Sequence, residues 1–137
     1  MRVAEVVVAE PQFVVTGQTV EHAAKRMITH DLRLLPVCRS EGTIVGAVTA
    51  RDIVKAVAQS RAPELCRVDD VMTSDYASCR HDDATDEVYR RMVSHGIEEM
   101  VVENSAGKRV GIVDRDFLAA IAGPVVLRPV HGPRKLA

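Results

Sequence analysis

The sequence repeats itself at a spacing of 65 residues, and this duplication constrains the fold more than any other feature. The pattern Val-Gly-x-Val at residues 45–48 recurs at 110–113. The pair Arg-Asp at residues 51–52 recurs at 115–116, a spacing of 64, which indicates that the second copy has lost one residue just before this pair. A duplication predicts two similar half-folds related by a pseudo-two-fold axis, with paired clefts where the halves meet.

Size and composition favour two mutually dependent halves. Each half has roughly 60–65 residues, a size at which a lone hydrophobic core is only marginally stable. The 137 residues are 47% hydrophobic and 27% charged, with only 3% aromatic residues, so the core is expected to be aliphatic. A net charge of −1 argues against a surface that attracts nucleic acid or anionic membranes.

The cysteines and the first ten residues bear on location. Cys38, Cys66 and Cys79 are odd in number and form no Cys-x-x-Cys pair, which argues against a disulfide framework and against structural zinc. The apolar run within residues 1–10 is interrupted by charges and is too short for a signal sequence or a membrane span. We therefore expect a cytoplasmic protein.

The same order of elements is predicted in each half. In the first half Thr19 is a good helix N-cap, and apolar residues at helical spacing predict one buried face at Val20, Ala23, Ala24, Met27 and Ile28. Gly42 suits the positive φ of a hairpin turn. The strands are expected at 13–15, 34–38, 44–48, 76–79, 100–102 and 110–113, and the helices at 20–30, 50–58, 86–95 and 116–122. Each half is thus an α/β (α+β) unit of order β-α-β-β-α.

These elements predict the organisation of the chain. The first unit is expected at residues 1–60, a linker at 61–67, the second unit at 68–123 and a C-terminal tail at 124–137. The tail contains prolines and basic residues and is expected to be flexible, with 125–127 docked.

Three segments together resemble a known family. Residues 68–73 read Val-Asp-Asp-Val-Met-Thr, residues 34–37 read Leu-Leu-Pro-Val, and residues 46–52 read Gly-Ala-Val-Thr-Ala-Arg-Asp. In this order, and within a duplicated body, they resemble a tandem pair of cystathionine-β-synthase-type (CBS) domains, also called a Bateman module. The resemblance covers the chain from residue 3 to about residue 121.

The resemblance implies an architecture and a function. It implies two units packed sheet to sheet around a pseudo-two-fold axis, often as a homodimer. It implies clefts that hold an adenosine-containing ligand such as AMP, ADP, ATP or S-adenosylmethionine, and a role in regulation or energy sensing that reports to an effector protein. No further cofactor and no catalysis are implied.

The residue types in the first cleft suit such a ligand. Thr49 and Arg51 stand at a helix N-terminus, where unpaired N–H groups and a guanidinium favour a phosphate. The carboxylate of Asp52 can accept hydrogen bonds from both ribose hydroxyls. The strand residues expected around the adenine are Val14, Val15, Thr16, Leu35, Pro36 and Val37. A Thr-x-x-Asp segment is, however, also a plain helix-capping pattern.

The second cleft is expected to bind differently. Asp114 stands where the first copy has a threonine hydroxyl, and it would repel a phosphate. Asp116 is expected to be the ribose acceptor, in a tighter loop. The other residues expected at this cleft are Met100, Val101 and Arg115.

Several alternatives stay open. A structural dimerisation module with vestigial clefts is the second hypothesis, and nucleic-acid binding through the basic tail is the third. A metal pair formed by His30 and His95 is less expected than their interaction with helix C-terminal carbonyls. No nucleophile–base motif, P-loop or dinucleotide fingerprint is visible, so we expect no enzyme activity.

Overall fold

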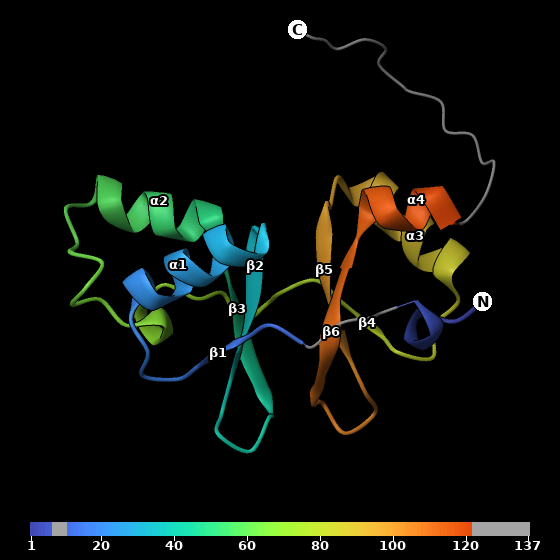
Figure 1. The fold of residues 1–137 in the computed structure, drawn as a ribbon, viewed down its shortest axis with the longest axis horizontal. Helices are drawn as coiled ribbons and strands as arrows, with labels where there is room; N and C mark the ends of the chain where they lie inside the picture. Colours follow the sequence, from blue (N-terminus) through green and yellow to red (C-terminus); the bar gives the residue numbers. More distant parts are fainter. Residues whose placement is uncertain (7–10, 122–137) are drawn as a thin grey trace, which may run out of the picture.

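The computed structural model describes residues 1–6 and 11–121, which form two units side by side (Figure 1). The elements of the first unit are β1 (Val14–Val15), α1 (Val20–His30), β2 (Leu34–Cys38), β3 (Ile44–Thr49) and α2 (Ala50–Ala58). Those of the second unit are β4 (Ser78–Arg80), α3 (Thr85–His95), β5 (Glu99–Glu103), β6 (Arg109–Asp114) and α4 (Arg115–Ile121). The predicted α/β class with two β-α-β-β-α units is confirmed. The predicted helix end at 122 and the tail at 124–137 lie outside the described residues.

Each unit contains one three-stranded sheet. The strand orders are β1-β2-β3 and β4-β5-β6; the first pair in each sheet is parallel and the second is an antiparallel hairpin. The hairpin turns place Gly42 at φ 103° and Gly107 at φ 75°, a region that only glycine adopts without strain. Thr19 caps α1 as predicted, its hydroxyl accepting a hydrogen bond from the His22 N–H.

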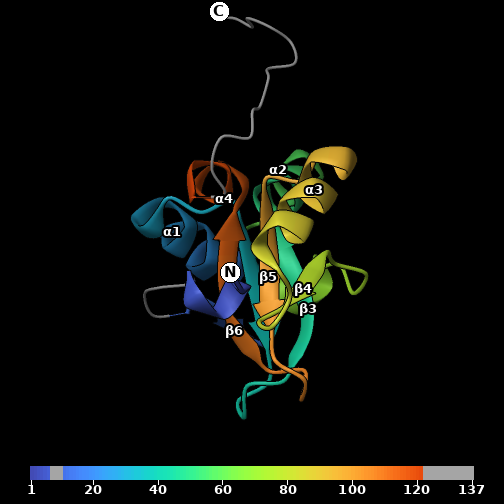
Figure 2. The same ribbon diagram turned by 90° about the vertical axis from the view of Figure 1, so that its right-hand side faces the viewer.

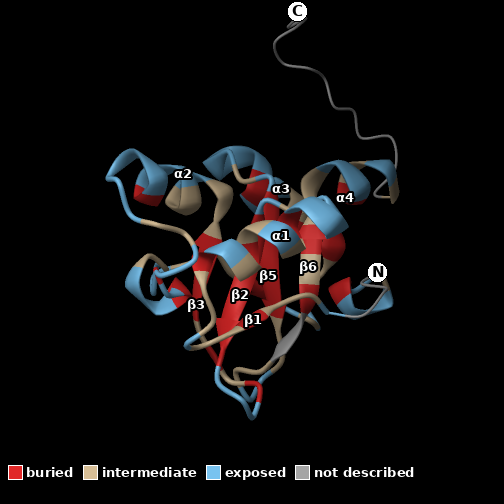
Figure 3. Cartoon of the chain, turned by 60° about the vertical axis from the view of Figure 1, so that its left-hand side comes forward, coloured by how far each residue is buried: buried red, intermediate tan, exposed pale blue. Residues whose placement is uncertain are grey.

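The middle strand of each sheet is covered on both faces. All five residues of β2 are buried, and the strands form the buried centre of the molecule (Figure 3). Leu35 and Val37 point to the helices of their own unit, where they pack with Met27. Leu34 and Cys38 point the other way and pack in one cluster with Val101 of β5. The continuous apolar run of β2 therefore reflects two separate packing partners.

The two sheets pack against each other around a pseudo-two-fold axis. Thr43 and Lys108, which occupy equivalent places in the two units, form a β-bridge with each other. Arg33 and Glu98, also equivalent, form an ion pair at the other end of the seam. Equivalent residues of the two units contact each other in this way where they lie close to a pseudo-two-fold axis. Tyr76 lies beside this interface, where its hydroxyl donates to Glu103, and burial raises its pKa to about 12.

Each unit is completed by a short segment that comes, in sequence, just before the other unit. The 3-10 turn η1 (Val3–Glu5) lies on the second unit, and the 3-10 turn η2 (Val68–Asp70) lies on the first (Figures 1 and 2). The Val3 N–H donates to the Asp83 carbonyl at 2.9 Å, and the Val68 N–H donates to the Gln18 carbonyl at 2.8 Å. Both valines are fully buried in the core of the unit they complete. The halves are therefore interlocked by exchanged segments.

The spacing of 65 residues persists through the last helix. Leu34 pairs with Thr49 in the first unit, and Glu99 pairs with Asp114 in the second. The helices that follow begin at residues 50 and 115. The predicted loss of one residue is therefore wrong: the two Arg-Asp pairs are similar in sequence but occupy different places in the fold.

One part of the predicted helix packing is also wrong. Ile28 was expected on the buried face of α1, but it is 83% exposed, and the buried face of this helix consists of Val20, Ala23 and Met27. Val54, Val57 and Val93 are likewise exposed. Within the described residues, the longest helices have 11 residues, and none is long and apolar enough to cross a membrane.

The segment exchange predicts that a residue of the first turn stabilises the second unit. Replacing Val3 with Ala should lower the free energy of unfolding by roughly 1–3 kcal/mol, because it leaves a cavity in a closed core. Hydrogen exchange should show the lost protection at β4, β5 and α3 before it appears in the first unit. Leu65→Ala, at an exposed linker residue, is the control and should change stability by less than about 0.5 kcal/mol. Loss of protection confined to α1 and β2 would contradict the exchange.

Candidate functional site

An open cavity of about 440 Å³ lies between the two units at the end of the seam where the helices are. The first unit lines it with the residue before β2, the start of β2 and the N-terminus of α2; the second unit lines it with the segment between α3 and β5. Its lining residues are Arg33, Leu34, Thr49, Ala50, Arg51, Gly96, Glu98 and Glu99. We call this space the inter-unit cavity.

The N-terminus of α2 is fixed by a reciprocal capping box. The Thr49 N–H donates to Oδ2 of Asp52 at 2.9 Å, and the Asp52 N–H donates to the Thr49 hydroxyl oxygen at 3.1 Å. The Ala50 N–H donates to the Arg33 carbonyl, which ties the helix start to the chain just before β2. The capping pattern recognised in the sequence is therefore present. Capping orients the Asp52 carboxylate and leaves its second oxygen without a hydrogen bond among the described residues.

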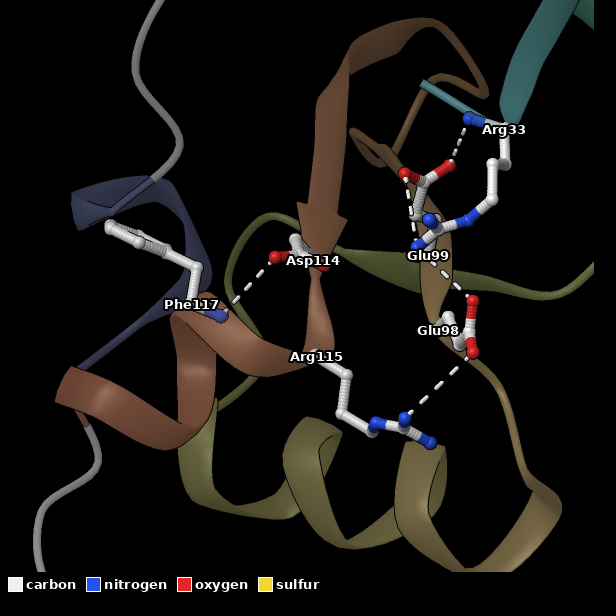
Figure 4. A network of polar contacts seen from close by, with 6 residues as sticks. All are labelled: Arg33, Glu98, Glu99, Asp114, Arg115 and Phe117. Carbon is white, nitrogen blue, oxygen red and sulfur yellow. Dashed lines mark hydrogen bonds and ion pairs between the residues drawn. The ribbon is translucent and has the colours of Figure 1, made fainter. Parts of the chain in front are cut away.

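A network of charged side chains from both units lies at the cavity (Figure 4). The Arg33 guanidinium lies 3.1 Å from Oε1 of Glu98 and 4.0 Å from Oε2 of Glu99. The backbone N–H of Arg33 also donates to Oε1 of Glu99 at 2.8 Å. Arg115 reaches the other oxygen of Glu98 at 4.0 Å. Glu98 thus joins one arginine from each unit.

Glu99 is the charged group most affected by burial. It begins the central strand β5, is 9% exposed and occupies the position that Leu34 holds in the first unit. Burial raises the pKa of its carboxyl above the usual value near 4.5, and the negative charges of Asp114 and Glu98 act in the same direction. The backbone N–H and the guanidinium of Arg33 partly oppose this rise. The ionised form therefore depends on Arg33.

The structure brings only part of the predicted first-cleft residues to the cavity. Thr49 and Arg51 line it, and Asp52 lies beside it, hydrogen-bonded to Thr49. The predicted strand residues are not among those that line it. Val14, Leu35 and Val37 are fully buried beneath the helices of the first unit.

The remaining strand residues of that prediction lie on β1 and β2. Val15 and Thr16 are half-buried at the end of β1, where their N–H groups donate to Gln18 and to the Cys38 carbonyl. Pro36 is buried within β2. The alternation of β2 explains the difference, because neighbouring residues of a strand point to opposite faces and cannot all line one cleft.

The charged network was not predicted from the sequence. Arg33 and Glu98 directly precede the strands β2 and β5, and Glu99 begins β5; none of them was among the predicted site residues. A signal was present, because Glu99 occupies the position of an apolar residue in the other copy. A carboxylate at a core position is rare unless it is paired.

In the second unit the equivalences change the predicted site. With the spacing of 65 residues, Asp114 corresponds to Thr49, Arg115 to Ala50 and Asp116 to Arg51. Phe117 corresponds to Asp52, and its N–H donates to Oδ2 of Asp114 as the Asp52 N–H does to Thr49 (Figure 4). The assumed equivalence of Asp116 with Asp52 is therefore wrong.

The two other predicted residues of the second unit lie in closed packing. Met100 is buried in the core beneath the helices of the second unit, and Val101 is buried between the sheets. They repeat the burial of Leu35 and Pro36, to which they correspond, so the two sites differ in the residues at the starts of α2 and α4.

The fold and the cavity define the class of protein: a duplicated pair of β-α-β-β-α units with a polar cavity at the seam. The family model described as "CBS domain" matches residues 3–59 and again residues 68–123. The chain therefore belongs to the CBS domain family.

Curated relatives include long enzymes and one short protein. The chain is 30% identical over 107 residues to homoserine O-acetyltransferase of Methanohalophilus mahii and 33% identical over 112 residues to L-aspartate semialdehyde sulfurtransferase of Methanosarcina acetivorans. It covers 21% and 22% of these two proteins, or about a fifth of their length. It is also 31% identical to an uncharacterized 17.7 kDa protein of Acidianus ambivalens, of which it covers 73%. The activities of the two enzymes belong to much longer chains.

Solved structures of CBS pairs share the fold. The CBS domain pair of protein MJ0100, in complex with 5′-methylthioadenosine and S-adenosyl-L-methionine, superposes with a TM-score of 0.77 at 26% identity and covers 90% of this chain and 96% of that one. The CBS domain protein PAE2072 of Pyrobaculum aerophilum, complexed with AMP, gives a TM-score of 0.75 at 22% identity and covers 89% of this chain and 98% of that one. At this identity the second likeness shows the fold alone.

The raised pKa of Glu99 predicts how stability depends on pH. Because the folded state holds the proton of Glu99 more tightly, this residue's contribution to stability is greatest below pH 4.5 and declines as the pH rises through the higher folded-state pKa. Glu99→Gln removes the titration and keeps an oxygen that can accept from the Arg33 N–H. The difference in unfolding free energy between E99Q and the parent should therefore shift in favour of E99Q as the pH rises from below 4.5 through the raised folded-state pKa.

Urea unfolding at a series of pH values measures this difference. The exposed Glu87 provides the control, because Glu87→Gln makes the same chemical change at the surface and leaves Glu99 in place. Parallel curves for E99Q and the parent would show that burial does not perturb Glu99.

Proposed function

We propose that the chain is a regulatory module that binds an adenosine-containing ligand in the inter-unit cavity. The observation that carries the proposal is the cavity itself, which is open, lies between two units and is lined by the capped N-terminus of α2. The MJ0100 domain pair, whose structure contains two adenosyl compounds, supports the same class of ligand. Cavities between packed units that combine apolar and polar lining are common ligand sites.

Each residue near α2 has a proposed role. Asp52 accepts hydrogen bonds from the ribose hydroxyls through the oxygen that the capping box leaves unused. Arg51 and the helix N-terminus hold an anionic group of the ligand. Leu34 and Ala50 supply the apolar lining. The strand residues that were expected to enclose the adenine have no role in this proposal, since none of them lines the inter-unit cavity.

Regulation is proposed to arise from the position of the cavity. A ligand there contacts both units and lies beside the Arg33–Glu98 ion pair that joins them, so binding changes the free energy of the unit–unit arrangement. An effector protein that recognises one arrangement would sense the ligand. A cytoplasmic location and a homodimer are part of this proposal.

A structural dimerisation module is the second candidate. It is supported by exposed apolar residues on helices of both units, namely Ile28, Val54, Val57, Val93 and Phe117. It would leave the cavity empty. Nucleic-acid binding through the basic tail concerns residues outside those described and stays a prediction.

Thermal unfolding in the presence of adenosyl compounds tests the first proposal. A ligand at 100 times its Kd should stabilise the fold by about 2.7 kcal/mol. Asp52→Asn can keep the capping oxygen but removes the charge, and it should weaken binding roughly 10- to 100-fold, the loss of charge-assisted hydrogen bonds to the ribose. Asp86→Asn on the exposed surface of α3 is the matched control and should bind as the parent does. Unchanged binding by D52N would remove Asp52 from the site.

Sedimentation equilibrium tests the homodimer. The parent should sediment at twice the chain mass of 15.0 kDa, and Val57→Glu should shift the population to the monomer, because a charge at an apolar interface is poorly solvated. Glu64→Gln in the exposed linker should leave the mass unchanged. A monomeric parent at all concentrations would contradict the dimer.

A further inference from the structure

The inter-unit cavity carries opposite charges on its two walls. The first unit contributes the guanidinium groups of Arg33 and Arg51, and the second contributes the carboxylates of Glu98 and Glu99. These four charges cancel at neutral pH if all are ionised. A site built to hold several phosphates would instead show a clear excess of cations.

Most of the positive charge near the cavity is already paired. Arg33 lies 3.1 Å from Glu98 and 4.0 Å from Glu99, and Arg115 lies 4.0 Å from Glu98. Among residues 1–6 and 11–121, Arg51 has no ion-pair partner. The cavity therefore offers one unpaired guanidinium, enough for one carboxylate.

The negative charge is concentrated on the side of the second unit. Glu98 is exposed at the mouth, and Glu99 lies deeper and is buried. Asp114, the cross-strand neighbour of Glu99, adds a third carboxylate behind this wall. Three carboxylates thus face the two guanidinium groups of Arg33 and Arg115 that pair with Glu98 and Glu99, so the wall keeps an excess of negative charge. A polyphosphate would meet repulsion from this wall, whereas a sulfonium or ammonium group would be attracted to it.

We infer that the cavity selects an adenosyl ligand whose 5′ substituent combines a positive charge with a single carboxylate, as in an adenosyl sulfonium amino acid, over adenine nucleotides. The inference rests on the proposed adenosyl-binding function and adds the charge of the ligand. Arg51 takes the carboxylate, and the sulfonium and ammonium groups lie toward Glu98 and Glu99. Selection against nucleotides thus comes from the wall that the second unit contributes.

Isothermal titration calorimetry of the whole chain with four ligands tests the inference. The ligands are S-adenosylmethionine, S-adenosylhomocysteine, AMP and ATP. The first two differ only by one methyl group and the positive charge on sulfur, so their ratio isolates the effect of that charge. We expect S-adenosylmethionine to bind about tenfold or more tightly than each of the other three, a difference of about 1.4 kcal/mol.

Two variants connect this preference with the charged wall. The double change Glu98→Gln and Glu99→Gln should bring the affinities for S-adenosylmethionine and S-adenosylhomocysteine close together and should strengthen ATP binding. Glu98→Gln alone changes an exposed residue and should give the same trend with a smaller effect, which keeps the test valid if the double variant does not fold. Glu87→Gln, away from the cavity lining, should preserve the parent ratios.

The outcomes separate the inference from the proposed function. AMP or ATP binding as tightly as S-adenosylmethionine would overturn the inference and leave the adenosyl-binding function intact. Equal affinities for S-adenosylmethionine and S-adenosylhomocysteine, or ratios unchanged by E98Q, would also overturn it. Binding of none of the four ligands at millimolar concentration would overturn both.

Discussion

Burial of both faces of the central strands is the constraint on which the rest of the structure depends. Each sheet has only three strands, and its own two helices cover one face. The other face carries apolar residues such as Leu34 and Val101, which are buried only because the second sheet packs against them. A unit of this size would expose that face if it stood alone, at a free-energy cost proportional to the apolar area. Pairing of the units is therefore a condition of folding, and the seam between them is a consequence.

The seam is apolar at its centre and charged at the end that forms the cavity. At that end Glu99 replaces the leucine of the other copy, and a buried carboxylate reduces stability unless it is paired and hydrogen-bonded. Arg33 supplies both kinds of contact from across the axis. These ion pairs lie next to the cavity. A ligand that changes the pairing of Arg33 would therefore also change the interaction of the two units. This is the end of the seam on which the proposed regulatory role depends.

Duplication has produced two units with different sites. The N-terminus of α2 offers a hydroxyl, a guanidinium and a carboxylate at Thr49, Arg51 and Asp52, whereas the equivalent residues of α4 are two carboxylates and a phenyl ring. The backbone is nearly the same in both, since each helix begins immediately after the hairpin and is capped from the preceding residue. Similar folding with different side chains is how a duplicated scaffold acquires one specific cavity.

The sequence by itself determined the duplication, the order of elements, the class of fold and the helix cap at Thr49 and Asp52, because these depend on local periodicity and on residues adjacent in the chain. Only the tertiary structure decided which partner covers each face of β2, that Phe117 rather than Asp116 corresponds to Asp52, and that η1 and η2 are exchanged between the units. It also brought Arg33 to Glu98 and Glu99, residues more than sixty positions apart. Such contacts depend on how the two sheets pack, and no short-range pattern in the chain encodes that packing.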